Sequence, residues 1–157
     1  FESGIADYCT MFEPTASDYE AEGKGYIVAS VGEQSGEIPY TCFTARQSYI
    51  DENPDKIEGL LRAVTKAIKF TMENDAATIA GYLTAYFDGT SEESLANSVQ
   101  AYKDIDAWVT NMAMEESAFT RLQDVIENSG ELERRVDFDE LILTDVAQKV
   151  YEEVYGI

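Results

Sequence analysis

Glu13 is the residue of this sequence best placed to do chemistry. It lies between the apolar run at 7–12 (DYCTMF) and Pro14, at the junction of a predicted strand and a predicted helix. A residue before proline is driven toward extended geometry, and ligands of open α/β sheets bind at the carboxyl ends of strands. The carboxylate therefore has two possible roles. It caps the N–H groups of Ala16 or Ser17, which the sequence alone favours, or it contacts a ligand.

The loop at 32–39 (GEQSGEIP) is the second candidate site. Its glycines and proline are typical of a turn, and its backbone N–H groups could cradle a small ligand with help from Ser35 and Glu37. The loop is neither a Walker motif nor a dinucleotide fingerprint, and a plain connector is the alternative. Aromatic side chains near the predicted strand ends could stack on a ligand ring, although such residues more often belong to a core: Tyr8, Phe12, Tyr26 and Tyr40.

The composition excludes several kinds of chemistry. The absence of histidine removes histidine-activated nucleophiles, histidine general bases and histidine zinc ligands. Cys9 and Cys42 cannot build a metal site between them, and buried free thiols are predicted in preference to a disulfide. The net charge of −20 argues against nucleic-acid binding, which needs basic side chains. A solvated acidic surface is the plainest interpretation of this charge.

The elements that must position these residues fall into two parts. Three strand-like runs come first, at 7–12, 26–31 and 40–45, and a helix from Pro14 to about Ala21 separates the first two. Five helical segments are expected from cap residues and apolar spacing. The first opens at Asn53-Pro54, the second is capped by Asp75 and the third starts at Ser91. The last two run from Glu115 to Ile126 and from Thr144 to about Tyr155.

Three strands are few for that many helices. The pattern therefore predicts an α/β fold in which a few strands are followed by several helices, with strand partners outside the 157 residues. Phe1 is not an initiator Met, and no basic or apolar leader precedes it, so we expect a fragment or a processed chain. Open strand edges in such a chain invite pairing with a second copy, so a homodimer is expected.

Several segments of residues 4–55 together resemble one protein family. They read GIADY followed by FEPTAS, then EGKGYIVASVG, then IPYT, then SYIDENPD. The combination resembles the substrate-binding proteins of bacterial ABC importers, of the nitrate/sulfonate/taurine and thiamine-pyrimidine-precursor type. The resemblance extends over nearly the whole chain, but its specific motifs are confined to these residues.

The resemblance implies the C-terminal half of a type II periplasmic-binding-protein fold, whose two lobes close on a ligand. Residues 1–31 would end the second lobe, 32–39 would cross between lobes, and 40–157 would return to the first lobe and add the terminal helices. The FEP segment would then lie at the cleft, which makes Glu13 the favoured ligand contact. Secondary contacts are expected by position: Tyr8, Phe12, Ser35, Glu37 and Tyr40.

The implied function is that of a non-enzymatic, extracytoplasmic solute-binding protein that presents its ligand to an ABC permease and needs no cofactor. A cleft carboxylate suits a ligand with N–H donors or positive charge, such as an aminopyrimidine. It suits a sulfonate or nitrate badly, because a desolvated carboxylate beside an anion is costly. Two alternatives stay open: an enzyme of pyrimidine or thiamine-precursor synthesis on the same fold, and a ligand-free interaction or sensor module.

Overall fold

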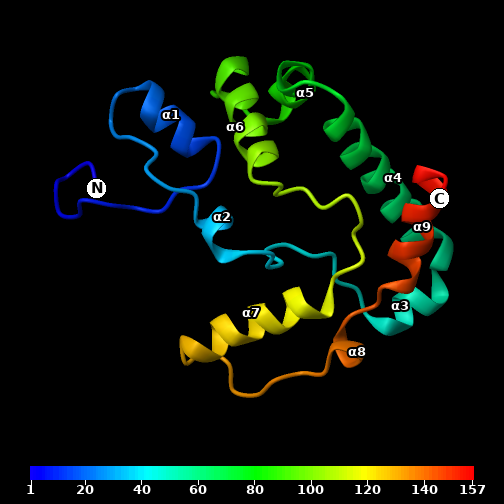
Figure 1. Cartoon of the computed structure of the whole chain (residues 1–157). Coiled ribbons are helices and arrows are strands. Elements are labelled where there is room, and N and C mark those ends of the chain that lie inside the picture. Colours follow the sequence, from blue (N-terminus) through cyan, green and yellow to red (C-terminus); the bar gives the residue numbers. More distant parts are fainter. The chain divides into compact units, whose positions relative to one another are not determined.

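The computed structural model describes residues 1–157, and its regular elements are all helical (Figure 1). The helices are α1 (Thr15–Ala21), α2 (Val31–Ser35), α3 (Gln47–Glu52), α4 (Pro54–Glu73), α5 (Ala76–Leu83), the 3-10 turn η1 (Thr84–Tyr86), α6 (Glu92–Asp104), α7 (Glu116–Asn128), α8 (Phe138–Leu141) and α9 (Asp145–Tyr155). No β-strand is present. The α/β fold expected from the sequence, with its few strands, is therefore wrong for this structure.

The predicted strands are extended or irregular segments without strand partners. Residues 7–12, 26–30 and 40–45 form no ladder, and their large side chains face solvent: Phe12 is 64% exposed, Tyr26 88% and Tyr40 79%. A strand needs a neighbour that pairs its N–H and C=O groups. The β-propensity of a residue describes how well its side chain fits a pleated, half-buried surface, rather than an intrinsic preference of its backbone. Without a neighbouring strand in this chain, the composition of these runs cannot produce a sheet.

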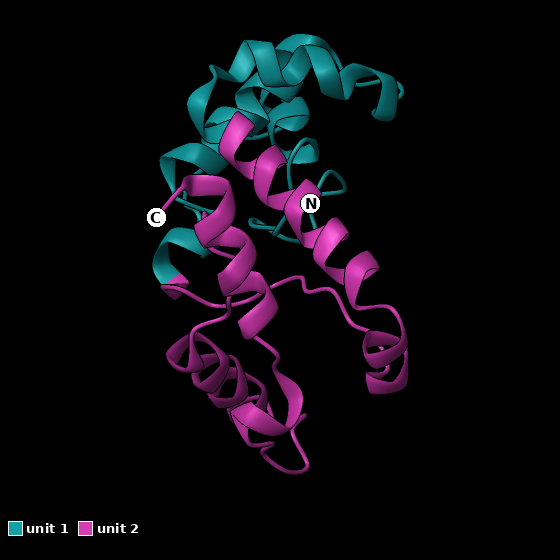
Figure 2. Ribbon diagram, turned by 90° about the vertical axis from the view of Figure 1, so that its right-hand side faces the viewer, with its two compact units in different colours: residues 1–34, 71–108 teal, residues 35–70, 109–157 magenta.

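The chain divides into two compact units (Figure 2). One comprises residues 1–34 and 71–108, and the other comprises residues 35–70 and 109–157. Each unit combines segments that are distant in the sequence. The division into lobes at 1–31, 32–39 and 40–157 that the family resemblance implies stays a prediction.

In the first unit, α5 packs against α6, and α1 lies against the same α6. The contact between α5 and α6 buries four apolar side chains: Ile79, Ala80, Leu95 and Val99. Asp75 accepts a hydrogen bond from the Thr78 N–H at 2.7 Å, and Ser91 accepts one from the Ser94 N–H at 3.0 Å. Both N-caps are those that the sequence predicts. In contrast, α1 has no buried residue.

In the second unit, α7 and α9 contribute the buried apolar side chains. They are Ala118 and Phe119 from α7 and Ala147 and Val150 from α9. The ring of Phe119 meets that of Phe138 edge-on, with 5.7 Å between centroids, so α8 is attached to α7. The core is small in both units, because eight apolar residues of the whole chain are buried.

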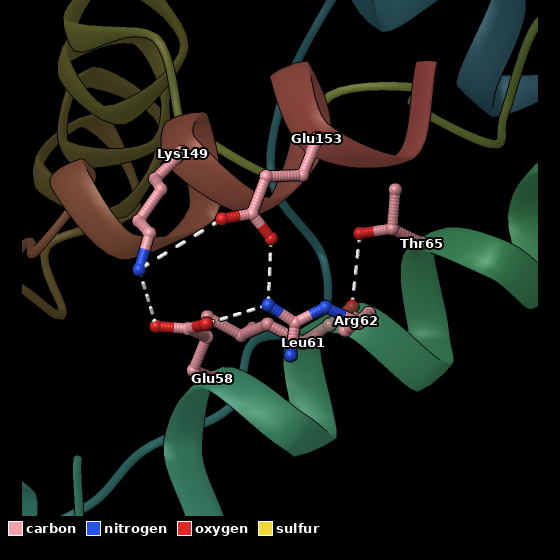
Figure 3. A network of polar contacts seen from close by, with 6 residues as sticks. All are labelled: Glu58, Leu61, Arg62, Thr65, Lys149 and Glu153. Carbon is pink, nitrogen blue, oxygen red and sulfur yellow. Dashed lines mark hydrogen bonds and ion pairs between the residues drawn. The ribbon is translucent and has the colours of Figure 1, made fainter. Parts of the chain in front are cut away.

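A network of charged side chains joins α4 to α9 in the second unit (Figure 3). Arg62 lies between Glu58 and Glu153, with N–O distances of 2.5 and 2.6 Å. Lys149 contacts the other oxygen of Glu58 at 2.7 Å. Beside them the buried hydroxyl of Thr65 donates to the carbonyl one turn earlier at 2.9 Å. These pairs are partly exposed, so each contributes modestly to stability and mainly fixes how α9 lies on α4.

The longest helix, α4, has 20 residues. Neither α4 nor any shorter helix has the length and apolar character required to cross a membrane.

Candidate functional site

Glu13 stands two positions before the first residue of α1, and its carboxylate caps the helix. Its Oε2 accepts a hydrogen bond from the Ser17 N–H at 3.0 Å, which confirms the capping role favoured by the sequence. Pro14 follows a cis peptide bond and precedes the first helical residue, Thr15. It was expected to be the first residue of the helix, so that prediction was wrong by one position.

Two serines of α6 face the carboxylates at α1. The Ser94 hydroxyl donates to Asp18 Oδ1 at 2.5 Å. The Ser98 hydroxyl lies 3.4 Å from Glu13 Oε2 and 2.8 Å from the Ser94 carbonyl. Both serines are buried, whereas Glu13 and Asp18 are half-buried. Two carboxylates thus meet two serine hydroxyls in one polar cluster of the first unit.

Sequence reasoning missed three members of this cluster: Asp18, Ser94 and Ser98. One signal was available, because the two serines stand one turn apart beside Leu95 and Val99 on the buried side of α6. Buried hydroxyl groups require hydrogen-bond partners. The identity of those partners was not available from local spacing, since they lie 76 and 85 positions away in the chain.

Asp18 and Glu13 both act as hydrogen-bond acceptors in this cluster. Glu13 receives both of its hydrogen bonds on Oε2, and an ionised carboxylate can accept about four. Its Oε1 can therefore accept a further N–H or O–H group. Chemically, the cluster can bind a hydrogen-bond donor or a cation.

The N-terminal segment is attached to α1 by a second group of polar side chains. Lys24 pairs with Glu2 at 3.3 Å and with Glu22 at 2.7 Å, and its ammonium lies 4.9 Å from the ring centre of Tyr19. A hydrogen bond from the Tyr19 hydroxyl, and then one from the Lys24 ammonium, lower the pKa of Glu2. The bond to Glu2 raises the pKa of Tyr19. These contacts are exposed, so they orient the segment more than they stabilise it.

The six residues predicted to contact a ligand divide between the two units. Tyr8 and Phe12 belong to the first unit with Glu13, and both side chains are exposed. The other three, Ser35, Glu37 and Tyr40, belong to the second unit. The grouping of all six into one site stays a prediction.

In the second unit, the predicted loop residues form a turn anchored to α7. The Ser35 hydroxyl donates to the Gly36 carbonyl at 3.0 Å. Gly36 has a positive φ of 69°, which favours glycine, and Arg121 Nη1 donates to the Glu37 carbonyl at 2.5 Å. The carboxylate of Glu37 and the ring of Tyr40 are exposed. Residues 31–35 are helical, so the prediction of a loop over 32–39 holds only for its second half.

The cysteines differ from expectation in one respect. Cys9 and Cys42 are free thiols, as predicted, but both are exposed, whereas burial was expected. Each lies in an extended segment that was predicted to be a buried strand. The side chains of Cys, Asp and Glu also form no group of three or more that could hold a metal ion.

Comparison with known proteins gives two matches. Residues 1–84 match the NMT1-like family. A protein of Bacillus subtilis (strain 168) with the name "Putative binding protein YtlA" is 35% identical over 153 residues, which are 98% of this chain and 46% of that protein. The chain therefore spans about half the length of the curated relative that it matches. No solved structure matches the chain significantly.

Proposed function

Because the chain belongs to the NMT1-like family, we propose that it is part of an extracytoplasmic solute-binding protein that delivers a small ligand to an ABC permease. The matched relative is named as a binding protein, which supports binding rather than catalysis. The proposed ligand is amine-bearing or heteroaromatic, and Glu13 is its principal contact. No cofactor is required for such a role.

The observation that carries the proposal is the state of the Glu13 carboxylate. It is half-buried, its Oε2 accepts from the Ser17 N–H and faces Ser98, and Oε1 keeps its acceptor capacity. A ligand amino group adjacent to Oε1 would gain a charge-assisted hydrogen bond, which is stronger than a neutral one. An anionic ligand would instead meet a carboxylate that is already partly desolvated. It would also approach a chain with a net charge of −20.

The aromatic residues supply the second proposed element of recognition. Tyr8 and Phe12 lie in the exposed segment that precedes Glu13. A flat heteroaromatic ring could stack on either side chain while its amino group reaches the carboxylate. Ser35, Glu37 and Tyr40 are proposed as further contacts on the basis of the family resemblance.

Calorimetry on the full-length protein tests the choice of ligand. Titration with the aminopyrimidine moiety of thiamine should give binding, and titration with taurine or nitrate should give none. Glu13→Gln should weaken the aminopyrimidine at least about tenfold, because it removes a charged acceptor. Glu73→Gln is the matched control, since Glu73 is an exposed glutamate of the same unit and lies outside every candidate contact segment. Tight binding of taurine or nitrate without any aminopyrimidine binding would reject the proposal.

A further inference from the structure

Polar side-chain contacts join α1 to α6. No residue of α1 is buried, whereas its neighbour α6 buries Ser94, Leu95, Ser98 and Val99. Leu95 and Val99 belong to the apolar core shared with α5. What faces α1 is the pair of serine hydroxyls. The hydrogen bonds between these serines and the carboxylates are therefore the specific connection between α1 and α6.

The two connections differ in strength because a hydroxyl has a single proton. Asp18 is the acceptor of the Ser94 hydroxyl, at 2.5 Å. The Ser98 proton is divided between the Ser94 carbonyl at 2.8 Å and Glu13 Oε2 at 3.4 Å, and distance favours the carbonyl. The Asp18–Ser94 bond is thus the main attachment of α1 to α6. Ser98 adds a weaker contact to the Glu13 carboxylate.

We propose that Ser94 and Ser98 are positioning residues that hold α1 on α6 and thereby fix the Glu13 carboxylate. We call the four side chains Ser94, Ser98, Asp18 and Glu13 the serine clasp. Glu13 also accepts the Ser17 N–H of α1. Movement of α1 away from α6 would therefore move the Glu13 carboxylate and, at the same time, loosen the first turn of α1. The consequence for ligand binding rests on the proposed function of Glu13, whereas the attachment of α1 does not.

Amide hydrogen exchange measured by NMR on the full-length protein tests the attachment. The informative amides are those of Ser17, Asp18 and Glu22, which donate to Glu13 Oε2, the Pro14 carbonyl and the Asp18 carbonyl respectively. Ser94→Ala should accelerate their exchange about tenfold, because it removes a hydrogen bond to a charged group. Ser98→Ala should have a smaller effect, centred on Ser17. Asn97→Ala, at an exposed position of the same helix, is the matched control and should leave exchange unchanged.

Restoration by a conservative variant separates positioning from packing. Ser94→Thr keeps the hydroxyl and should return the protection of α1 close to that of the unmodified protein. The proposal is overturned if Ser94→Ala exchanges like Asn97→Ala, if α1 amides are already unprotected in the unmodified protein, or if Ser94→Thr behaves like Ser94→Ala.

Calorimetry with the aminopyrimidine tests the consequence for Glu13. Ser94→Ala should weaken binding several-fold, and Ser94→Thr should restore it. If Ser94→Ala accelerates exchange without changing affinity, the serines hold the helix but do not position the carboxylate for a ligand. If the unmodified protein does not bind the aminopyrimidine, the proposed function fails, and the exchange experiment still decides whether the clasp holds α1.

Discussion

Asp75 illustrates at the scale of one residue how a carboxylate sets the start of a helix in this chain. Its Oδ1 accepts the Thr78 N–H at 2.7 Å, in extended backbone geometry. Hydrogen bonds from the backbone and then the side chain of Thr78 lower the pKa of Asp75. Relative to the protonated form, the ionised form of Asp75 is therefore more stable in the folded protein than in the unfolded chain. This makes the stability of α5 dependent on pH in a defined direction.

We expect Asp75→Ala to lower the melting temperature by about 2–4 °C at neutral pH, because a lost N-cap destabilises a helix. Since the folded-state pKa of Asp75 is below its unfolded value, the contribution is complete above about pH 5 and is lost as pH falls through the folded-state pKa. The difference between the two proteins should thus shrink toward pH 3. Thermal unfolding followed by circular dichroism measures it.

Asp75→Asn is the control for this prediction, because asparagine caps helices nearly as well but does not titrate. It should retain most of the stability at neutral pH. A difference between the unmodified protein and Asp75→Ala that grows as the solution is acidified would contradict the assigned direction of the pKa shift.

Single residues were predictable from the sequence where their partners are local. The caps at Asp75 and Ser91 depend on an N–H three positions away, and the Glu13 cap depends on one four positions away. Such contacts follow from spacing and residue type alone. The bonds from Ser94 and Ser98 to α1 follow from tertiary packing, so the candidate site was predicted as one carboxylate without its supporting hydroxyl groups.

At the scale of elements, Gln123 connects α7 to the segment that follows it. Its amide donates to the Val136 carbonyl at 3.1 Å and accepts the Val136 N–H at 2.8 Å. The side chain is buried, with 8% exposure. It therefore satisfies both backbone groups of one residue in the way that a neighbouring strand would. Without it, the Val136 N–H and carbonyl would each lack a partner in a partly buried place.

We expect Gln123→Ala to reduce the free energy of unfolding by about 2 kcal/mol, because buried backbone groups lose their partners. Gln123→Glu should lose at least as much, since one carboxylate oxygen would face the Val136 carbonyl in a buried place without a proton to donate. Urea denaturation provides the measurement. Gln100→Ala, on an exposed face of α6, is the control and should change stability by less than about 0.5 kcal/mol. Equal effects of Gln123→Ala and Gln100→Ala would refute the role of the amide.

Elements were predictable where apolar spacing extends over several turns. The patterns over α4, α5, α6, α7 and α9 predicted those helices to within a few residues, because a long amphipathic stripe identifies both the element and its buried face. The short apolar runs at 7–12, 26–31 and 40–45 were misassigned. Strand formation depends on pairing with a distant segment, which composition does not report. The short helices α2, α3 and α8 carry too few turns to show a period.

At the scale of the whole molecule, the excess of 31 acidic over 11 basic side chains dominates the electrostatics. Opposing it are ion pairs such as Arg62 with Glu58 and Glu153, and Arg135 with Asp124 and Glu127. These pairs are partly or largely exposed. The homodimer expected from the sequence stays a prediction. Two copies of the chain would repel each other, because both carry this excess of negative charge.

Salt therefore has two opposing effects on stability, and their magnitudes decide the outcome. It weakens the ion pairs, but exposed pairs contribute little even at low salt. It also screens the mutual repulsion of a net charge of −20, because the Debye length falls from about 30 Å at 0.01 M to about 8 Å at 0.15 M. Repulsion acts over these longer distances and destabilises the compact state. We expect the second effect to prevail.

Raising sodium chloride from about 0.01 M to about 0.15 M should accordingly raise the melting temperature by a few degrees, measured by calorimetry. A variant in which the exposed residues Glu73, Glu131 and Glu133 are changed to Gln has a net charge of −17, from −20 plus 3. It should be more stable than the unmodified protein at low salt and should respond less to added salt. A melting temperature that falls with salt in both proteins would mean that the ion pairs outweigh the repulsion. In that case Arg62→Gln should reduce the fall, since Arg62 lies between two carboxylates.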